Sequence, residues 1–120
     1  MKTPCSSHAF EEPNRKEFPL YSGLIKYFPD ALMDVSHVSF VGNEQHNPGQ
    51  PLHWAKDKSK DHKDALLRHL KDSGKFDDDG LRHSAKVAWR ALAALQVEIE
   101  KEMKLYSIDV NYELVKTKTK

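Results

Sequence analysis

The sequence contains one cysteine, no long apolar run and no excess of charge of either sign. Because Cys5 is alone, no disulfide can form within the chain, which is typical of proteins in a reducing compartment. No segment reaches the roughly 20 apolar residues of a membrane-spanning helix, and no signal-peptide core is evident. The formal net charge is only +1, so binding to nucleic acid through bulk charge is not predicted. We therefore expect a cytoplasmic protein with neither a membrane nor a nucleic-acid partner.

The chain is long enough for one small domain. Of its 120 residues, 38% are hydrophobic and 31% are charged, which limits the apolar surface that one copy can bury. We expect a single helical domain over residues 18–105, flanked by a flexible arm at 1–17 and a tail at 106–120. The thin core favours a homo-oligomer.

Helical spacing and turn signals predict an all-α fold with three main helices. Pro29 fits the first position of a helix, and the run from Asn47 to Pro51 must interrupt one. A second helix is expected from a cap at Asp57 or Ser59 to about residue 72. The third is expected over about residues 80–105, with a buried stripe that follows helical spacing. The stripe comprises Ala85, Ala88, Leu92, Leu95 and Ile99.

The segments on either side of the helices have different patterns. Residues 18–28 are apolar and aromatic but are interrupted by proline and glycine, so we expect a strap, extended or with one helical turn, packed on the core. Residues 109–115 alternate weakly between apolar and polar side chains, which favours a short extended tail that contacts a neighbouring chain.

Charged and imidazole side chains gather on the second and third predicted helices, which a short loop should bring together. They favour a site for a divalent metal, magnesium or manganese, and a phosphate. Trp54, in the connection before them, can stack on a base. The candidate metal ligands are Glu44, Asp61 and Asp64, the candidate catalytic residues are His69 and His83, and the candidate substrate-binding residues are Trp54, Arg68, Lys86 and Arg90.

Each of these features also has a purely structural interpretation. The charges can form ion pairs on solvated helix faces, of which Asp64 with Arg68 is one expected pair. Trp54 can cover the end of the core, and the aspartates at 77–79 can cap the last helix. Other chemistries have less support, since the chain has no His-Glu-x-x-His motif and no glycine-rich phosphate loop.

An ordered set of residues resembles a known family. The set is Gly42, His46, Trp54, Arg68-His69-Leu70, Asp77, Asp79-Gly80, His83 and Trp89. In this order it is similar to the N-terminal domain of phage-type dATP/dGTP diphosphohydrolases, over about residues 20–103. The resemblance implies an all-α protein of an infected host cell's cytoplasm that hydrolyses a purine deoxynucleoside triphosphate to the monophosphate and pyrophosphate with a divalent metal.

One departure from related enzymes keeps a second function open. All-α nucleotide pyrophosphatases generally carry Glu-Glu-x-x-Glu and Glu-x-x-Asp motifs on facing helices. This chain has neither, and the nearest match is Asp61-x-x-Asp64. The alternative is therefore a protein that binds a nucleotide or nucleotide signal without turning it over, such as a phage counter-defence sponge.

Overall fold

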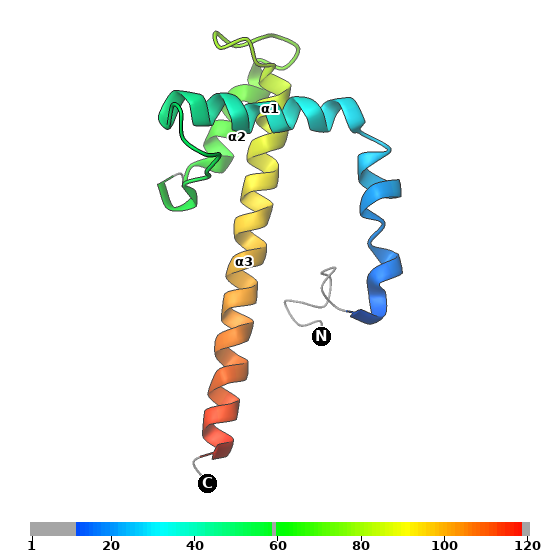
Figure 1. Cartoon of the computed structure of the whole chain (residues 1–120), viewed down its shortest axis with the longest axis vertical. Helices are drawn as coiled ribbons and strands as arrows, with labels where there is room; N and C mark the ends of the chain where they lie inside the picture. The colour runs from blue at the N-terminus through cyan, green and yellow to red at the C-terminus, as the bar shows by residue number, and fades with distance from the viewer. Residues whose placement is uncertain (1–11, 59, 119–120) are drawn as a thin grey trace.

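The computed structural model describes residues 12–58 and 60–118, and this part of the chain is all-α (Figure 1). The predicted class and the three main helices are confirmed. The main helices are α1 (Pro29–His46), α2 (His62–Lys71) and α3 (His83–Lys118), and the short ones are η1 (Glu12–Glu17), η2 (Tyr21–Ile25) and η3 (Lys56–Lys58). Among the described residues, none of these helices combines the length and apolarity that a bilayer span requires.

The helices meet at one end of an elongated molecule. Helix α2 lies along the first part of α3, α1 crosses the pair, and the rest of α3 projects away from them (Figure 1). The radius of gyration is 18.3 Å, whereas a compact chain of this length has about 14 Å. The core is consequently restricted to the region where the three helices cross.

Helix α1 has the boundaries that its sequence predicts. Pro29 occupies the start, and at the end the Asn47 N–H donates to the Asn43 carbonyl at 2.7 Å. The buried Asn43 side chain fixes the following turn: its Nδ2 donates to the Gln50 carbonyl at 3.0 Å and its Oδ1 accepts from the His53 N–H at 3.2 Å. This one side chain anchors the connection that leads to α2.

Helix α2 begins later than the sequence suggests. Its N-cap is Asp61, whereas Asp57 lies in the separate turn η3, which is closed by the Lys58 N–H on the Ala55 carbonyl at 3.1 Å. The helix ends before Gly74, whose φ of 91° is readily adopted only by glycine.

The core consists mostly of small side chains. Its buried apolar members are Val35, Ala65, Leu81, Ala85 and Ala93. The predicted stripe on α3 is right for Ala85 but wrong for Leu92 and Leu95, which are each 49% exposed. The buried side of α3 carries alanines, whose small side chains let the helices approach closely. The larger Leu92 and Leu95 lie on another side of α3.

The predicted strap does not pack on the core. The segment containing η2 runs away from the start of α1 (Figure 1), and Tyr21 and Tyr27 are 65% and 70% exposed. Its apolar side chains are therefore left uncovered within one copy of the chain.

The predicted extended tail is also wrong where the structure describes it. Residues 106–118 continue α3 as helix, since the sequence after Gly80 has no glycine or proline that would end the helix. In the predicted N-terminal arm, residues 12–17 form η1, whereas residues 1–11 lie outside the described part.

Close packing of α2 on α3 predicts that a larger side chain at Ala65 destabilises the fold. Ala65 is 1% exposed, so Ala65→Leu should lower the free energy of unfolding by about 1–3 kcal/mol. Urea denaturation followed by circular dichroism measures this. Lys63→Ala, an exposed change on the same helix, should stay within about 0.5 kcal/mol. Equal stability of Ala65→Leu and the parent would contradict the described packing.

Candidate functional site

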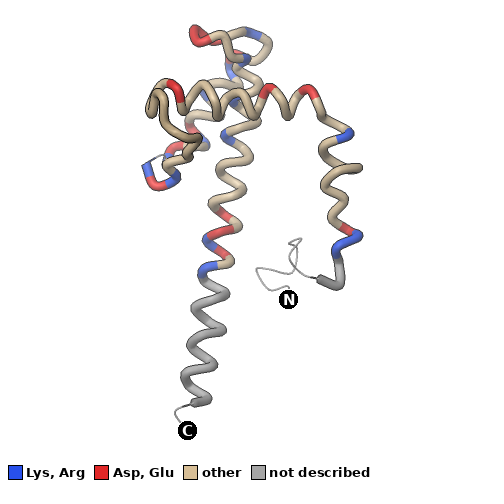
Figure 2. Tube along the Cα trace, in the orientation of Figure 1, with Lys and Arg blue, Asp and Glu red and all other residues tan. Residues whose placement is uncertain are grey.

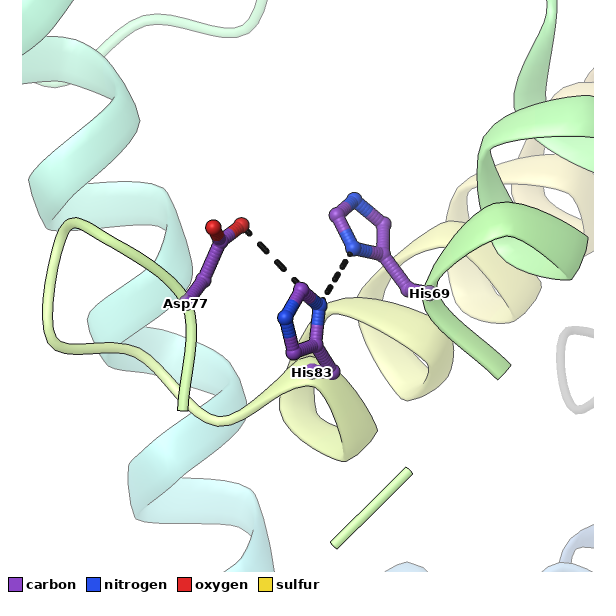
Figure 3. A group of neighbouring side chains, drawn as sticks. All are labelled: His69, Asp77 and His83. Atoms are coloured by element: carbon purple, nitrogen blue, oxygen red, sulfur yellow. Dashed lines mark hydrogen bonds and ion pairs between the residues drawn. The ribbon is translucent and has the colours of Figure 1, made fainter. Parts of the chain in front are cut away.

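Two histidines and an aspartate meet where α2 ends and α3 begins (Figure 3). His69 lies near the end of α2, His83 is the first residue of α3, and Asp77 comes from the loop between them. The Nδ1 atoms of the two rings are 2.9 Å apart, and the Asp77 Oδ2 lies 4.0 Å from the His83 Nδ1. The ligand atoms of all three residues lie within 4.8 Å of one another.

The loop is folded so that Asp77 faces the helices. The Asp77 N–H donates to the Leu81 carbonyl at 2.7 Å, and the Gly80 N–H donates back to the Asp77 carbonyl at 3.0 Å. Gly80 has a φ of 83°, which allows this tight reversal. The buried Leu81 side chain then fastens the loop to the core.

Lys86 ties the same loop to α3. Its Nζ lies 2.7 Å from Asp77 Oδ2 and 2.7 Å from Asp79 Oδ2. Burial acts to lower the pKa of Lys86, but the hydrogen bonds that Lys86 donates to the two carboxylates outweigh this effect and raise the pKa. The hydrogen bond from Lys86 lowers the pKa of Asp77. For Asp79, burial acts to raise the pKa, and the Lys86 bond helps to lower it overall. All three groups are therefore charged at neutral pH.

The contact between the His69 and His83 rings limits which ring nitrogens can carry a proton. Two ring nitrogens 2.9 Å apart require one donor and one acceptor, so the rings cannot both be protonated at these atoms. Burial lowers the pKa of His69, and the charges of Lys86 and His83 lower it further. A neutral His69 has a nitrogen lone pair that can accept a proton or bind a metal.

The donor set fits a divalent transition ion. Two imidazole nitrogens and one carboxylate oxygen are the ligands that manganese, iron, cobalt or zinc accept in proteins, whereas magnesium prefers oxygen alone. Among the residues that the structure describes, His69, Asp77 and His83 form the one such group, which the expected ligands Glu44, Asp61 and Asp64 do not join.

A second cluster lies further along the same two helices. The rings of Trp54, His62 and Trp89 contact one another, with centroids 5.5 to 6.4 Å apart. The Trp89 Nε1 donates to the Ser39 hydroxyl on α1 at 2.8 Å, and the Arg90 Nη1 donates to the His62 Nδ1 at 3.1 Å. Burial, followed by the Arg90 charge, lowers the pKa of His62.

The remaining predicted residues are distributed around these clusters. Arg68 pairs with Asp61 at 3.2 Å, not with Asp64 as expected, and both partners are more than half exposed. This pairing contributes most to the lowered pKa of Asp61. Glu44 and Asp64 are exposed on α1 and α2.

Sequence reasoning brought His69, His83 and Lys86 to one place but missed their aspartate partners. The residues themselves suggested a capping role for the aspartates at 77–79, and Asp77 and Asp79 otherwise entered only through the family resemblance. The Asp79 Oδ1 accepts from the Leu81 N–H at 3.1 Å, which fastens the loop two residues before α3 begins. The sequence feature that points to these aspartates is Lys86. It lies in the first turn of α3 with no acidic residue within one turn of it on that helix, so its partners must come from elsewhere.

The structure thus defines an all-α protein with two imidazoles and a carboxylate grouped beside a lysine. Comparison with known families identifies it further. The chain belongs to the family described as dATP/dGTP diphosphohydrolase, N-terminal, whose sequence model matches residues 12–105. No curated protein and no solved structure matches the chain significantly.

The buried histidines predict that stability falls on acidification. The folded pKa of His69 lies below the usual value of 6.5, so the unfolded chain binds the proton more tightly. The stabilisation is present above about pH 6.5 and is lost as the pH falls through the folded pKa. His69→Gln should therefore show a smaller loss of unfolding free energy than the parent between about pH 7.5 and about pH 5.5.

Urea denaturation at the two pH values measures this difference. His46→Gln, which removes an exposed histidine outside the cluster, is the control variant. An unchanged pH dependence in His69→Gln would show that His69 is not held neutral by burial.

Proposed function

We propose that this protein hydrolyses a purine deoxynucleoside triphosphate to the monophosphate and pyrophosphate with a divalent metal. The observation that carries the proposal is the grouping of His69, Asp77 and His83 beside Lys86. The family is named for dATP and dGTP diphosphohydrolysis, and this grouping supplies the types of side chain that such a reaction uses.

The metal would be held by the two histidines and Asp77. When bound, a divalent ion polarises phosphate oxygens and makes a bound water more acidic. We place it here rather than at Glu44, Asp61 and Asp64, because those carboxylates do not gather and Asp61 already bonds Arg68. The nitrogen ligands favour manganese over magnesium.

Lys86 and the histidine pair supply the protein's own chemistry. An ammonium group has three N–H donors, and two of those on Lys86 bond Asp77 and Asp79. The third can bond a phosphate oxygen of the substrate, in a position that the two carboxylates fix. His69, kept neutral by burial, can offer the lone pair of one ring nitrogen to the ion.

The arginines extend the positive surface along α2 and α3. Arg90 belongs to the aromatic cluster, where it bonds His62 and lies over the Trp89 ring. Burial and then the Arg90 charge lower the pKa of His62, and the same charge is a smaller cause of the lowered pKa of His69, after burial, Lys86 and His83. Arg68 lies one residue from His69, and we assign it an outer phosphate contact made in exchange for its exposed pair with Asp61.

Nucleotide binding without turnover is the second candidate. The observation that favours it is the lack of the Glu-Glu-x-x-Glu and Glu-x-x-Asp motifs. A binding protein would use the same lysine and arginines but release no pyrophosphate, so one assay separates the two functions.

That assay is pyrophosphate release from dGTP and dATP with Mg²⁺ or Mn²⁺. Asp77→Asn should reduce the rate by about a hundredfold or more, because it removes a metal ligand and a partner of Lys86. Asp78→Asn changes the exposed neighbouring aspartate and should leave the rate within about twofold. Binding without release in the parent would favour the second candidate, and equal rates in both variants would exclude Asp77 from the site.

We also propose that a second copy of the chain covers the exposed apolar surface. Figure 2 shows no charged residue between Glu17 and Lys26, or on α3 between Arg90 and Glu98. Exposed large apolar side chains in these two stretches have 38–65% of their surface accessible, and they are Leu20, Tyr21, Leu24, Ile25, Leu92 and Leu95. Uncovered apolar surface on this scale is characteristic of protein interfaces.

Light scattering should then report a dimer or a larger closed oligomer at micromolar concentration. Leu92→Asp should shift the equilibrium toward the monomer by about tenfold or more, because it places a charge in the interface. Leu52→Asp, at a leucine 68% exposed in the connection before α2, is the control and should not change the assembly. A monomeric parent would contradict the proposal.

A further inference from the structure

Two buried N–H groups in the aromatic cluster have no acceptor within the described part of the chain. The Trp54 Nε1 and the His62 Nε2 are both buried, and neither has a hydrogen-bond partner among residues 12–58 and 60–118. Most buried polar groups in proteins are paired, and an unpaired one costs stability. Two in one ring cluster therefore indicate that something else completes it.

Both groups are donors. The His62 Nδ1 is bonded to Arg90, and a guanidinium can only donate, so the ring proton must be on Nε2. The indole Nε1 of Trp54 is a donor in every state. Trp89 is the contrasting case, because its N–H already has the Ser39 hydroxyl as acceptor. The missing group must therefore present an acceptor to each of these two atoms.

The position of the cluster suits one end of a nucleotide. His62 lies seven residues before His69 on α2, which is about 10.5 Å along a helix axis. That separation is of the order of the distance from a nucleotide's base to its phosphates. Phosphates beside His69 and Lys86 would thus place the base at this ring cluster, where its edge can reach the N–H groups of Trp54 and His62.

We infer that Trp54 and His62 bind the acceptor edge of a 6-oxopurine, guanine or hypoxanthine, in preference to adenine. On this edge guanine presents two acceptors, N7 and O6, whereas adenine presents N7 and the N6 donor. The two N–H groups of the protein match the two acceptors of guanine. With adenine, one of these N–H groups would face the N6 donor. The inference rests on the proposed function, since it takes a nucleotide as the ligand.

The base reaches these atoms through the connection that carries Trp54. In the described part of residues 51–61 the three-residue turn η3 is the one helical element, so no longer helix ties the indole to α2 or α3. The connection is held by Asn43 at its start and by an ion pair of Lys56 with Glu100 at 2.7 Å, about two-fifths exposed on each side. Such exposed pairs are weak and separate at small cost.

The test uses nucleosides without metal, so that phosphate binding and turnover do not contribute. Calorimetric titration should show that the parent binds deoxyguanosine and deoxyinosine about ten- to a hundredfold more tightly than deoxyadenosine. Deoxyinosine has the same N7 and O6 edge without the 2-amino group, so it isolates the contact in question.

Trp54→Phe keeps an aromatic ring and removes the N–H, and it should reduce the preference by about fivefold or more. His62→Phe should do the same if circular dichroism shows that it folds, and otherwise Trp54→Phe decides alone. Trp89→Phe is the matched control, because its N–H is already bonded within the protein, and it should keep the preference.

Equal affinity of the parent for the three nucleosides would overturn the inference, as would a preference that Trp54→Phe retains. In either case a water molecule alone bonds the two donors. Pyrophosphate release from triphosphates is measured separately. If the parent releases pyrophosphate but shows no preference for a base, only the inference is overturned and the proposed function stands.

Discussion

The hydrogen-bonded ion pairs of Lys86 with Asp77 and Asp79 determine the geometry of the candidate site. Both distances are 2.7 Å, and they join the loop between α2 and α3 to the first turn of α3. Without them two carboxylates would repel each other in a tight loop, and Asp77 would not face His69 and His83. Charge-assisted bonds between partly buried groups are stronger than exposed ion pairs, so this link can hold the loop in one conformation.

The contact between α2 and α3 brings two kinds of recognition onto one pair of helices. Near the loop lie charged groups and imidazoles, which suit a metal and phosphates. Two turns further along lie the rings of Trp54, His62 and Trp89, which suit a base. Arg90 belongs to the second group, in which it bonds His62 and lies over the Trp89 ring. Small residues such as Ala65 and Ala85 allow the two helices to approach closely.

Local signals in the sequence predicted the helices well and the contacts less well. Pro29 and the Asn47 turn set the limits of α1, and the spacing of histidines and Lys86 on the last two helices brought them near one loop. The partners of Lys86 depend on how residues 77–81 reverse direction, which spacing does not encode. The exposure of Leu92 and of the aromatic segment before α1 depends on which faces α1 and α2 cover. Helical periodicity predicts which residues share one face of a helix, but it does not predict which other helix packs on that face.

The central claim is that two histidine nitrogens and the Asp77 carboxylate bind a divalent ion beside Lys86. Electron spin-echo spectroscopy of Mn²⁺ added to the protein tests it most directly, since it detects nitrogen nuclei bonded to the ion without any need for turnover. The account predicts nitrogen couplings from two imidazoles, with one lost in His83→Ala. A Mn²⁺ signal with oxygen ligands only would contradict it, and would place the ion on carboxylates elsewhere in the chain.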